Sequence, residues 1–159
     1  MIALVMGTTG SGKTTVGEMV AEQLHWTFLD ADNFHSAANI DKMRHGIPLT
    51  DEDRAGWLAA MHAELVKRDA AGENIVLACS ALKQKYRDEI GAGLDMKVVY
   101  LKGDYATMAA HIAGRHGHFA GEGILAGQFA DLEEPKNAIV ENVSKTPEEI
   151  AAEIVKKIG

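Results

Sequence analysis

A glycine-rich segment near the start of the chain carries the residues best suited to bind phosphate. Residues 7–14, GTTGSGKT, fit the pattern G-x-x-x-x-G-K-[ST] at every fixed position and lie between an apolar run and an amphipathic one. Backbone N–H groups in such a loop surround phosphate oxygens, and the positive end of the following helix assists them. We expect Lys13 to reach the β- and γ-phosphates and the Thr14 hydroxyl to bind Mg²⁺. The pattern predicts an ATP site formed by Gly7, Thr8, Thr9, Gly10, Ser11, Gly12, Lys13, Thr14 and Thr15.

Two carboxylates follow the second apolar run, in the segment FLDADNFH at residues 28–35. Residues i and i+2 of an extended strand point the same way, so Asp30 and Asp32 would emerge together despite their mutual repulsion. A divalent cation beside the phosphates would offset that repulsion. We expect Asp30 to serve Mg²⁺ through water, and Asp32 to orient or deprotonate the hydroxyl of a second substrate. The alternative is that the two acids only cap a loop.

A third segment suited to phosphate chemistry spans residues 115–123, RHGHFAGEG, which combine a cation with three glycines. Such a segment can close over phosphates, exclude water and bring the charge of Arg115 to the transferred phosphoryl group. An ordinary surface loop remains the alternative. His116 and His118 lack a third ligand at a convincing spacing, so we expect them to face solvent and not to bind a metal.

The elements that position these residues follow from the alternation of short apolar runs with longer amphipathic ones. Strands are predicted at residues 2–6, 27–30, 75–79, 97–101 and 138–142. Helical spacing relates the apolar residues of 16–24, 57–65 and 105–112, and Thr50 and Thr146 fit helix N-caps. Strands that alternate with helices predict a doubly wound α/β sheet with right-handed crossovers.

Length and composition limit the class of protein. A chain of 159 residues predicts one domain, and its net charge of −7 argues against a general binder of nucleic acid or membrane surfaces. We expect no export signal and no membrane-spanning run. The single cysteine, Cys79, excludes an internal disulfide and fits a reducing cytosol.

Several longer blocks resemble one family. They are the phosphate loop, the Asp-x-Asp pair, HSAANIDKMRHGIPLTDEDRAGWL at 35–58, CSALKQKYRD at 79–88, LKGD at 101–104, and RHGHF followed by LAGQFADLEEP within 115–135. Together they make the chain similar to gluconokinases, which belong with shikimate kinase and the nucleoside monophosphate kinases. The resemblance runs from residue 1 to about residue 135, and the blocks at 35–58 and 79–88 are its specific part.

The resemblance implies a P-loop nucleoside triphosphate hydrolase fold with a parallel five-stranded sheet of order 2-3-1-4-5, flanked by helices and carrying a mobile lid. It implies one domain, with a core at about 1–34, 74–112 and 132–159, a substrate-binding helical segment at about 35–72 and a lid at about 113–131. The implied reaction transfers the γ-phosphate of ATP to the 6-hydroxyl of D-gluconate, with Mg²⁺ as cofactor. A homodimer in the cytoplasm is the expected setting.

The resemblance also assigns roles to residues. Lys13, Asp32 and Arg115 would be catalytic, and Asp30 would be linked to Mg²⁺ through water. Arg54 falls where shikimate kinase uses an arginine to grip its substrate carboxylate. The other expected substrate contacts are Lys83 and Arg87, which lie one helical turn apart, and, with weaker support, His35 and Gln128.

Two departures from the relatives bear on these expectations. Residues 55–57, AGW, lack the proline that many gluconokinases have before the tryptophan, which leaves the start of that helix open. Residues 79–81, CSA, replace the glycine triplet of shikimate kinase and disfavour shikimate as the acceptor. A P-loop kinase for another small acceptor, such as shikimate or a nucleotide, and a non-catalytic ATP-binding regulatory module remain the alternatives.

Overall fold

The computed structural model of the chain describes residues 1–113 and 122–158. Its centre is a sheet of five parallel strands in the order β2-β3-β1-β4-β5. The strands are β1 Ile2–Met6, β2 Thr27–Asp30, β3 Ile75–Ala78, β4 Met96–Lys102 and β5 Ile139–Asn142. The predicted α/β class and strand order are confirmed, and the strand boundaries differ from the prediction by at most one residue.

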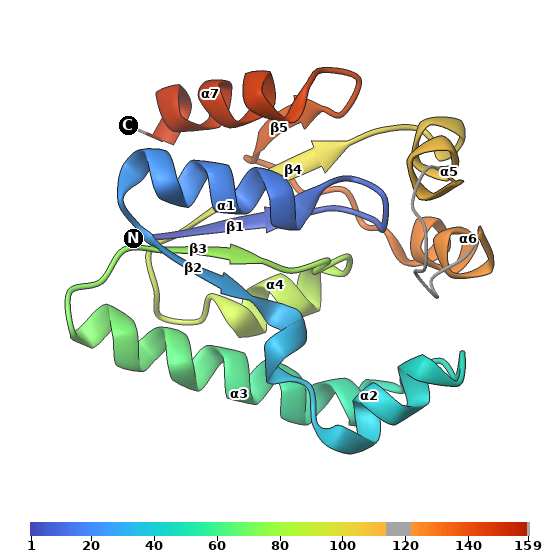
Figure 1. The fold of residues 1–159 in the computed structure, drawn as a ribbon. Coiled ribbons are helices and arrows are strands. Elements are labelled where there is room, and N and C mark those ends of the chain that lie inside the picture. The colour runs from blue at the N-terminus through green and yellow to red at the C-terminus, as the bar shows by residue number, and fades with distance from the viewer. Residues whose placement is uncertain (114–121, 159) are drawn as a thin grey trace.

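Helices cover both faces of this sheet. They are α1 Lys13–Leu24, α2 Ala37–Arg44, α3 Asp51–Ala70, α4 Gln84–Ile90, α5 Tyr105–Ala113, α6 Glu122–Asp131 and α7 Pro147–Ile158, with a 3-10 helix, η1, at Ala31–Phe34. Figure 1 shows α1 and α7 on one face and α3 and α4 on the other, with α5 and α6 side by side beyond the carboxyl ends of the strands. Parallel strands bring their carboxyl ends to one edge, so the loops that follow them meet there.

The core has two apolar layers, one on each face of the sheet. Alternate residues of β1 enter different layers: Ala3 and Val5 pack with α1 and α7, while Leu4 packs with α3. All five residues of β1 are buried. Burial on both faces explains why this strand is continuously apolar in sequence.

The predicted helix caps are present. The Thr50 hydroxyl accepts from the Asp53 N–H at 3.1 Å, and the Asp53 carboxylate accepts from the Thr50 N–H at 2.9 Å, so α3 begins at Asp51 without a proline. The Thr146 hydroxyl accepts from the Glu149 N–H at 3.2 Å at the start of α7.

Within the described ranges, no helix combines the length and apolar character needed to cross a membrane.

The division into core, helical segment and lid stays a prediction. The segment 35–72 contains α2 and α3, and the predicted lid at 113–131 contains α6. Arg115, His116 and His118 lie outside the described residues.

Candidate active site

The loop between β1 and α1 has the geometry of a phosphate-binding turn. Gly10 and Gly12 adopt left-handed backbone conformations, with φ of 85° and 86°. A side chain on Gly10 would also collide with the main chain, since its Cβ would lie 2.8 Å from the Met108 carbonyl oxygen. Gly12 is the N-cap of α1, and no side chain caps that helix end. The first N–H groups of α1 are therefore suited to bind an anion.

Asp30 connects this loop to the end of β2. Its Oδ2 accepts from the Thr14 hydroxyl at 3.3 Å, and its Oδ1 accepts from the Asp32 N–H at 2.9 Å. Across the loop, the Lys13 ammonium donates to the Thr8 carbonyl oxygen at 3.2 Å. The hydrogen bond from the Asp32 N–H makes Asp30 the N-cap of η1. The loop-capping alternative therefore describes part of what this carboxylate does.

Asp32 does not continue the strand. The expectation that both acids lie on an extended segment is wrong, because β2 ends at Asp30 and Asp32 lies in η1. Both carboxylates nevertheless line one cavity. Although part of Asp32 is exposed, its carboxyl group loses enough hydration to raise its pKa above the ordinary 3.8. The negative charge of Asp30 raises that pKa further, while His35 and Lys13 act in the opposite direction.

This cavity has a volume of about 1040 Å³ and opens between the phosphate loop, η1, α2, the start of α3, and α6. It brings together eleven of the predicted site residues: Thr9, Gly10, Gly12, Lys13, Thr14, Thr15, Asp30, Asp32, His35, Arg54 and Gln128. Lys83 and Arg87 are not among the described residues that line it. The oxygen of the Gln128 side chain accepts from the Thr9 N–H at 2.6 Å, which joins α6 to the phosphate loop.

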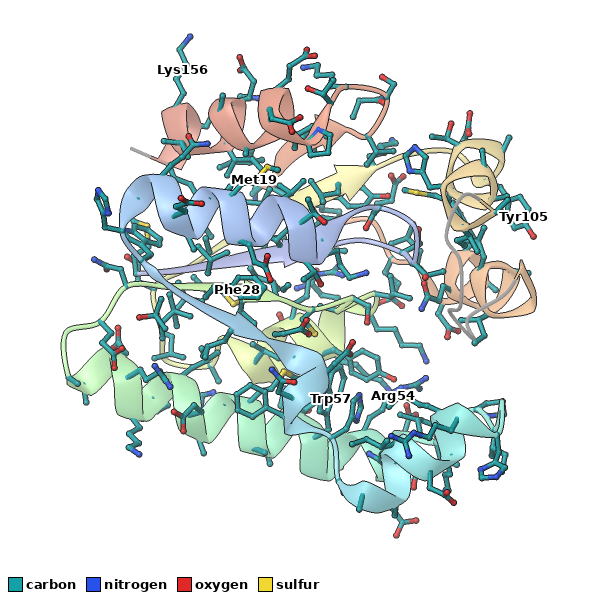
Figure 2. The ribbon with its side chains drawn as sticks, viewed as in Figure 1. Met19, Phe28, Arg54, Trp57, Tyr105 and Lys156 are labelled. Atoms are coloured by element: carbon teal, nitrogen blue, oxygen red, sulfur yellow. The ribbon has the colours of Figure 1, made fainter. Side chains whose placement is uncertain are left out.

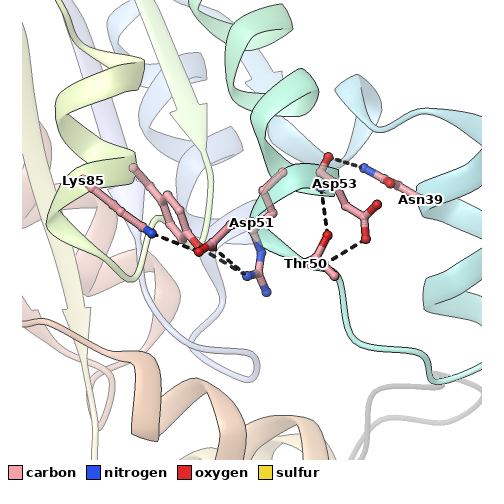
Figure 3. Close-up of polar contacts among 7 residues, drawn as sticks. Asn39, Thr50, Asp51, Asp53 and Lys85 are labelled. Atoms are coloured by element: carbon pink, nitrogen blue, oxygen red, sulfur yellow. Dashed lines mark hydrogen bonds and ion pairs between the residues drawn. The ribbon is translucent and has the colours of Figure 1, made fainter.

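Arg54 extends from the first turn of α3 toward the space below α6 (Figure 2). Its Nη1 donates to the Tyr86 hydroxyl at 3.2 Å and lies 3.8 Å from Asp51 Oδ1. The Tyr86 hydroxyl donates to Asp51 Oδ1 at 2.8 Å, and Lys85 Nζ donates to Asp51 Oδ2 at 3.1 Å. Figure 3 shows this chain of contacts beside the cap of α3.

Arg87 makes structural contacts that the sequence did not predict, and its predicted contact with substrate stays a prediction. Its side chain is buried, and Nη1 donates to the carbonyl oxygens of Ala81 and Leu82 at 2.7 and 3.1 Å. Nη2 donates to the Gln84 side chain at 3.0 Å and to the Glu133 carbonyl oxygen at 2.8 Å. The helical spacing could not predict these hydrogen bonds, because main-chain carbonyl partners leave no pattern in the sequence. Lys83 precedes α4 as its N-cap, and its predicted contact with substrate stays a prediction.

Trp57 holds η1 in place. Its indole N–H donates to the Ala31 carbonyl oxygen at 2.7 Å, between the two acids in sequence. Its ring also stacks on that of His35, with centroids 4.5 Å apart and planes at 8°. Burial lowers the pKa of His35 below its ordinary 6.5, so this ring is mainly neutral near pH 7. Sequence periodicity assigned Trp57 to the core and gave no sign of this second role.

A smaller cavity, of about 550 Å³, lies across the phosphate loop from the first. Both cavities are lined by Gly10, Gly12 and Thr15, so the loop separates them. His111 lines the smaller cavity, and its Nδ1 lies 2.8 Å from the Gly10 carbonyl oxygen. Residues 143–147 form the opposite wall. Sequence reasoning assigned no part in ligand binding to His111 or to this wall, and the cavity forms only where α5 and α7 approach the loop.

The oxygen ligands near the phosphate loop fit Mg²⁺. Thr14 and Asp30 supply a hydroxyl and a carboxylate, which are the hard oxygen donors that this ion prefers. In the part of the chain that the structure describes, no group of three or more His, Cys, Asp or Glu side chains is arranged to hold a metal. Kinase magnesium sites often use one or two carboxylates together with substrate phosphates and water, so the donors present suffice.

Comparisons with known proteins agree with this geometry. A family model described as shikimate kinase matches residues 9–159. A gluconokinase of Gluconobacter oxydans is 43% identical over 133 residues, covering 83% of this chain and 75% of the relative. The thermoresistant gluconokinase of Escherichia coli K12 is 37% identical over 164 residues, covering 98% of this chain and 94% of the relative.

Solved structures point the same way. The crystal structure of a gluconokinase from Sinorhizobium meliloti 1021 superposes with a TM-score of 0.85 at 36% identity, covering 98% of this chain and 94% of the other. Shikimate kinase from Aquifex aeolicus, at 14% identity and a TM-score of 0.60, shares the fold. The chain belongs to the gluconokinase family, within the wider group that the shikimate kinase model describes.

Proposed function

We propose that this protein is an ATP-dependent gluconokinase, which converts D-gluconate and ATP to 6-phospho-D-gluconate and ADP. Besides the family of the chain, one observation supports this proposal. A single cavity is lined by Lys13 of the phosphate loop, by the acid pair, and by Arg54 at the opposite wall. A site for a phosphate donor thus adjoins groups suited to a hydroxylated acid.

For the nucleotide, we assign the smaller cavity to the base. Val16, Val143, Pro147 and Ile150 give it apolar walls that suit a purine, while Ser11 and the glycines lead to the phosphate loop. The phosphates would then cross the loop toward the larger cavity, where Lys13 stabilises the charge that develops during transfer. Mg²⁺, held by Thr14 and by Asp30 through water, would neutralise charge on the β- and γ-phosphates when bound.

For the acceptor, we assign the carboxylate of gluconate to Arg54, whose planar guanidinium suits a two-pronged contact. His35 and Gln128 are proposed to contact its hydroxyls. Asp32 accepts the proton of the 6-hydroxyl while that oxygen bonds to the γ-phosphorus. The bond from this phosphorus to the bridging oxygen breaks, and ADP leaves. A carboxyl with a raised pKa is a stronger base than an ordinary one, which suits Asp32 to this step.

We also propose that the enzyme works in the cytoplasm as a homodimer. The resemblance to gluconokinases supports this setting, and the single buried cysteine fits a reducing compartment. Sedimentation equilibrium measures the assembly, and a mass of 17.1 kDa would contradict the dimer.

A panel of acceptors tests the proposed reaction. The protein is incubated with Mg-ATP and either D-gluconate, shikimate or a nucleoside monophosphate, and ADP release is followed. Release that depends on gluconate is the expected result. Release with shikimate or a nucleotide alone would identify another P-loop kinase, and no stimulation by any acceptor would favour a regulatory ATP-binding module.

A further inference from the structure

Tyr86 of α4 is a residue of the larger cavity to which the proposed reaction gives no task. It is 7% exposed, and its ring lies among three cations. Arg54 Cζ, Lys83 Nζ and Lys85 Nζ are 5.8, 5.8 and 5.5 Å from the ring centroid. These distances favour cation–π attraction, so the ring helps to gather positive charge in a protein whose net charge is −7.

The hydroxyl of Tyr86 has a fixed direction. It carries one proton, and this proton is donated to Asp51 Oδ1 at 2.8 Å. A lone pair of the same oxygen therefore faces Arg54 Nη1, which donates to it at 3.2 Å. Lys85 in turn holds the other oxygen of Asp51 at 3.1 Å. Asp51 thus orients the hydroxyl, and the hydroxyl orients the guanidinium.

These contacts use one nitrogen of the Arg54 guanidinium group, Nη1. Among the described residues, its hydrogen bond and its ion pair both run through Nη1. The edge formed by Nη2 and Nε keeps its donors for another group, and that edge can make two parallel bonds to a carboxylate. An arginine side chain has several rotatable bonds. Fixing Nη1 therefore reduces the conformational entropy that is lost when the edge formed by Nη2 and Nε binds a ligand.

We infer that Tyr86, oriented by Asp51, is a positioning residue that sets Arg54 to receive the carboxylate of a sugar acid. The inference rests on the proposed function, which gives Arg54 that carboxylate. It adds a determinant of acceptor affinity that acts through Arg54 and does not touch the phosphates. The Tyr86 hydroxyl proton is already committed to Asp51, which argues against a direct bond from it to substrate.

Steady-state kinetics of Tyr86→Phe test this, with wild type measured first. The variant keeps the ring and loses the hydroxyl, so the KM for gluconate should rise about tenfold, while the KM for ATP stays within about twofold of wild type. Asp51→Asn, at the exposed start of α3, should raise the KM for gluconate about threefold because the hydroxyl loses its charged acceptor. This second variant tests the same contact without changing the core.

Two matched variants serve as controls. Tyr100→Phe removes a tyrosine hydroxyl that donates to Glu134 at 3.0 Å outside the cavity. Glu52→Gln removes a negative charge from the same first turn of α3 as Asp51. Both should leave the KM for gluconate unchanged. A rise as large as that of Tyr86→Phe or Asp51→Asn would mean that general stability or helix charge, and not positioning, explains the effect.

A double-mutant cycle with Arg54→Ala separates positioning from direct contact. If Tyr86 acts through Arg54, adding Tyr86→Phe to Arg54→Ala should cause no further rise in the KM for gluconate. A further rise of about tenfold would overturn the inference, since Tyr86 would then act on substrate by itself. An unchanged KM in Tyr86→Phe would also overturn it while the proposed function stands. Wild type without gluconate turnover would overturn both.

Discussion

At the scale of single residues, two neighbouring carboxylates have different surroundings, which supports the different tasks proposed for them. Asp30 uses one oxygen for the Asp32 N–H and the other for the Thr14 hydroxyl, so its position is fixed beside the phosphate loop. Asp32 has a raised pKa, first through lost hydration and then through the charge of Asp30. Two neighbouring acids in such different surroundings can take different roles in one reaction.

This electrostatic difference predicts the pH dependence of the reaction. In the proposed reaction Asp32 accepts the proton only in its ionised form, so the rate should fall as the pH drops through its raised pKa. The acid limb of kcat/KM should therefore lie above the ordinary aspartate value of 3.8. Because Asp30 contributes to the shift, Asp30→Asn should move this limb to lower pH, whatever it does to the absolute rate.

The measurement is a pair of pH–rate profiles with D-gluconate as acceptor. Titration of gluconate itself is common to both enzymes, so the difference between the limbs reports on the protein. A limb in Asp30→Asn at the same pH as in wild type would show that Asp32 is not the group that titrates.

At the scale of elements, the acid pair depends on a contact between α3 and η1. The Trp57 indole donates to the Ala31 carbonyl oxygen at 2.7 Å, and its ring supports His35. Thr50 is the N-cap of α3, so the helix begins at the next residue, Asp51. Trp57 follows this cap by two helical turns. The position of Asp32 is thus set by a helix that starts about twenty residues later in the chain.

Trp57→Phe tests this dependence. Phenylalanine keeps an aromatic ring but leaves the buried Ala31 carbonyl without its donor, so the free energy of unfolding should fall by about 1–3 kcal/mol. The kcat should fall about tenfold as η1 loses its anchor. Chemical denaturation and steady-state kinetics give both values.

Trp26→Phe is the matched control, because Trp26 packs against the opposite core layer, away from the acid pair. It should leave kcat near that of wild type even where stability falls. Equal loss of kcat in both variants would contradict a specific role for the Trp57 contact.

At the scale of the whole molecule, the fold places two cavities beside the phosphate loop, which suits it to bring together the reacting ends of the two proposed ligands. The smaller cavity lies between α1, α5 and the loop before α7, and the larger one opens toward α2, α3 and α6. The phosphate loop lies between them and contributes to both. This arrangement follows from a parallel sheet, which collects at one edge the loops that follow β1, β2 and β3.

Much of this architecture could be predicted from sequence because its causes are local. Continuous apolar runs marked the buried strands, Thr50 and Thr146 marked helix starts, and glycine spacing marked the phosphate loop. The features that were missed depend on which elements meet. Arg87 is bonded to the carbonyl of Glu133, 46 residues away, and Tyr86 to Asp51, 35 residues away. No spacing along one helix reports such partners.

Phosphorus NMR of a completed reaction tests most directly whether phosphate passes from ATP to the terminal hydroxyl of gluconate. Wild-type protein is mixed with Mg-ATP and D-gluconate, and the phosphorus signal is correlated with the protons of the sugar acid. We expect one phosphate monoester, coupled to the protons on C6 and equimolar with ADP. ADP accompanied by free inorganic phosphate, or an ester on another carbon, would contradict the reaction.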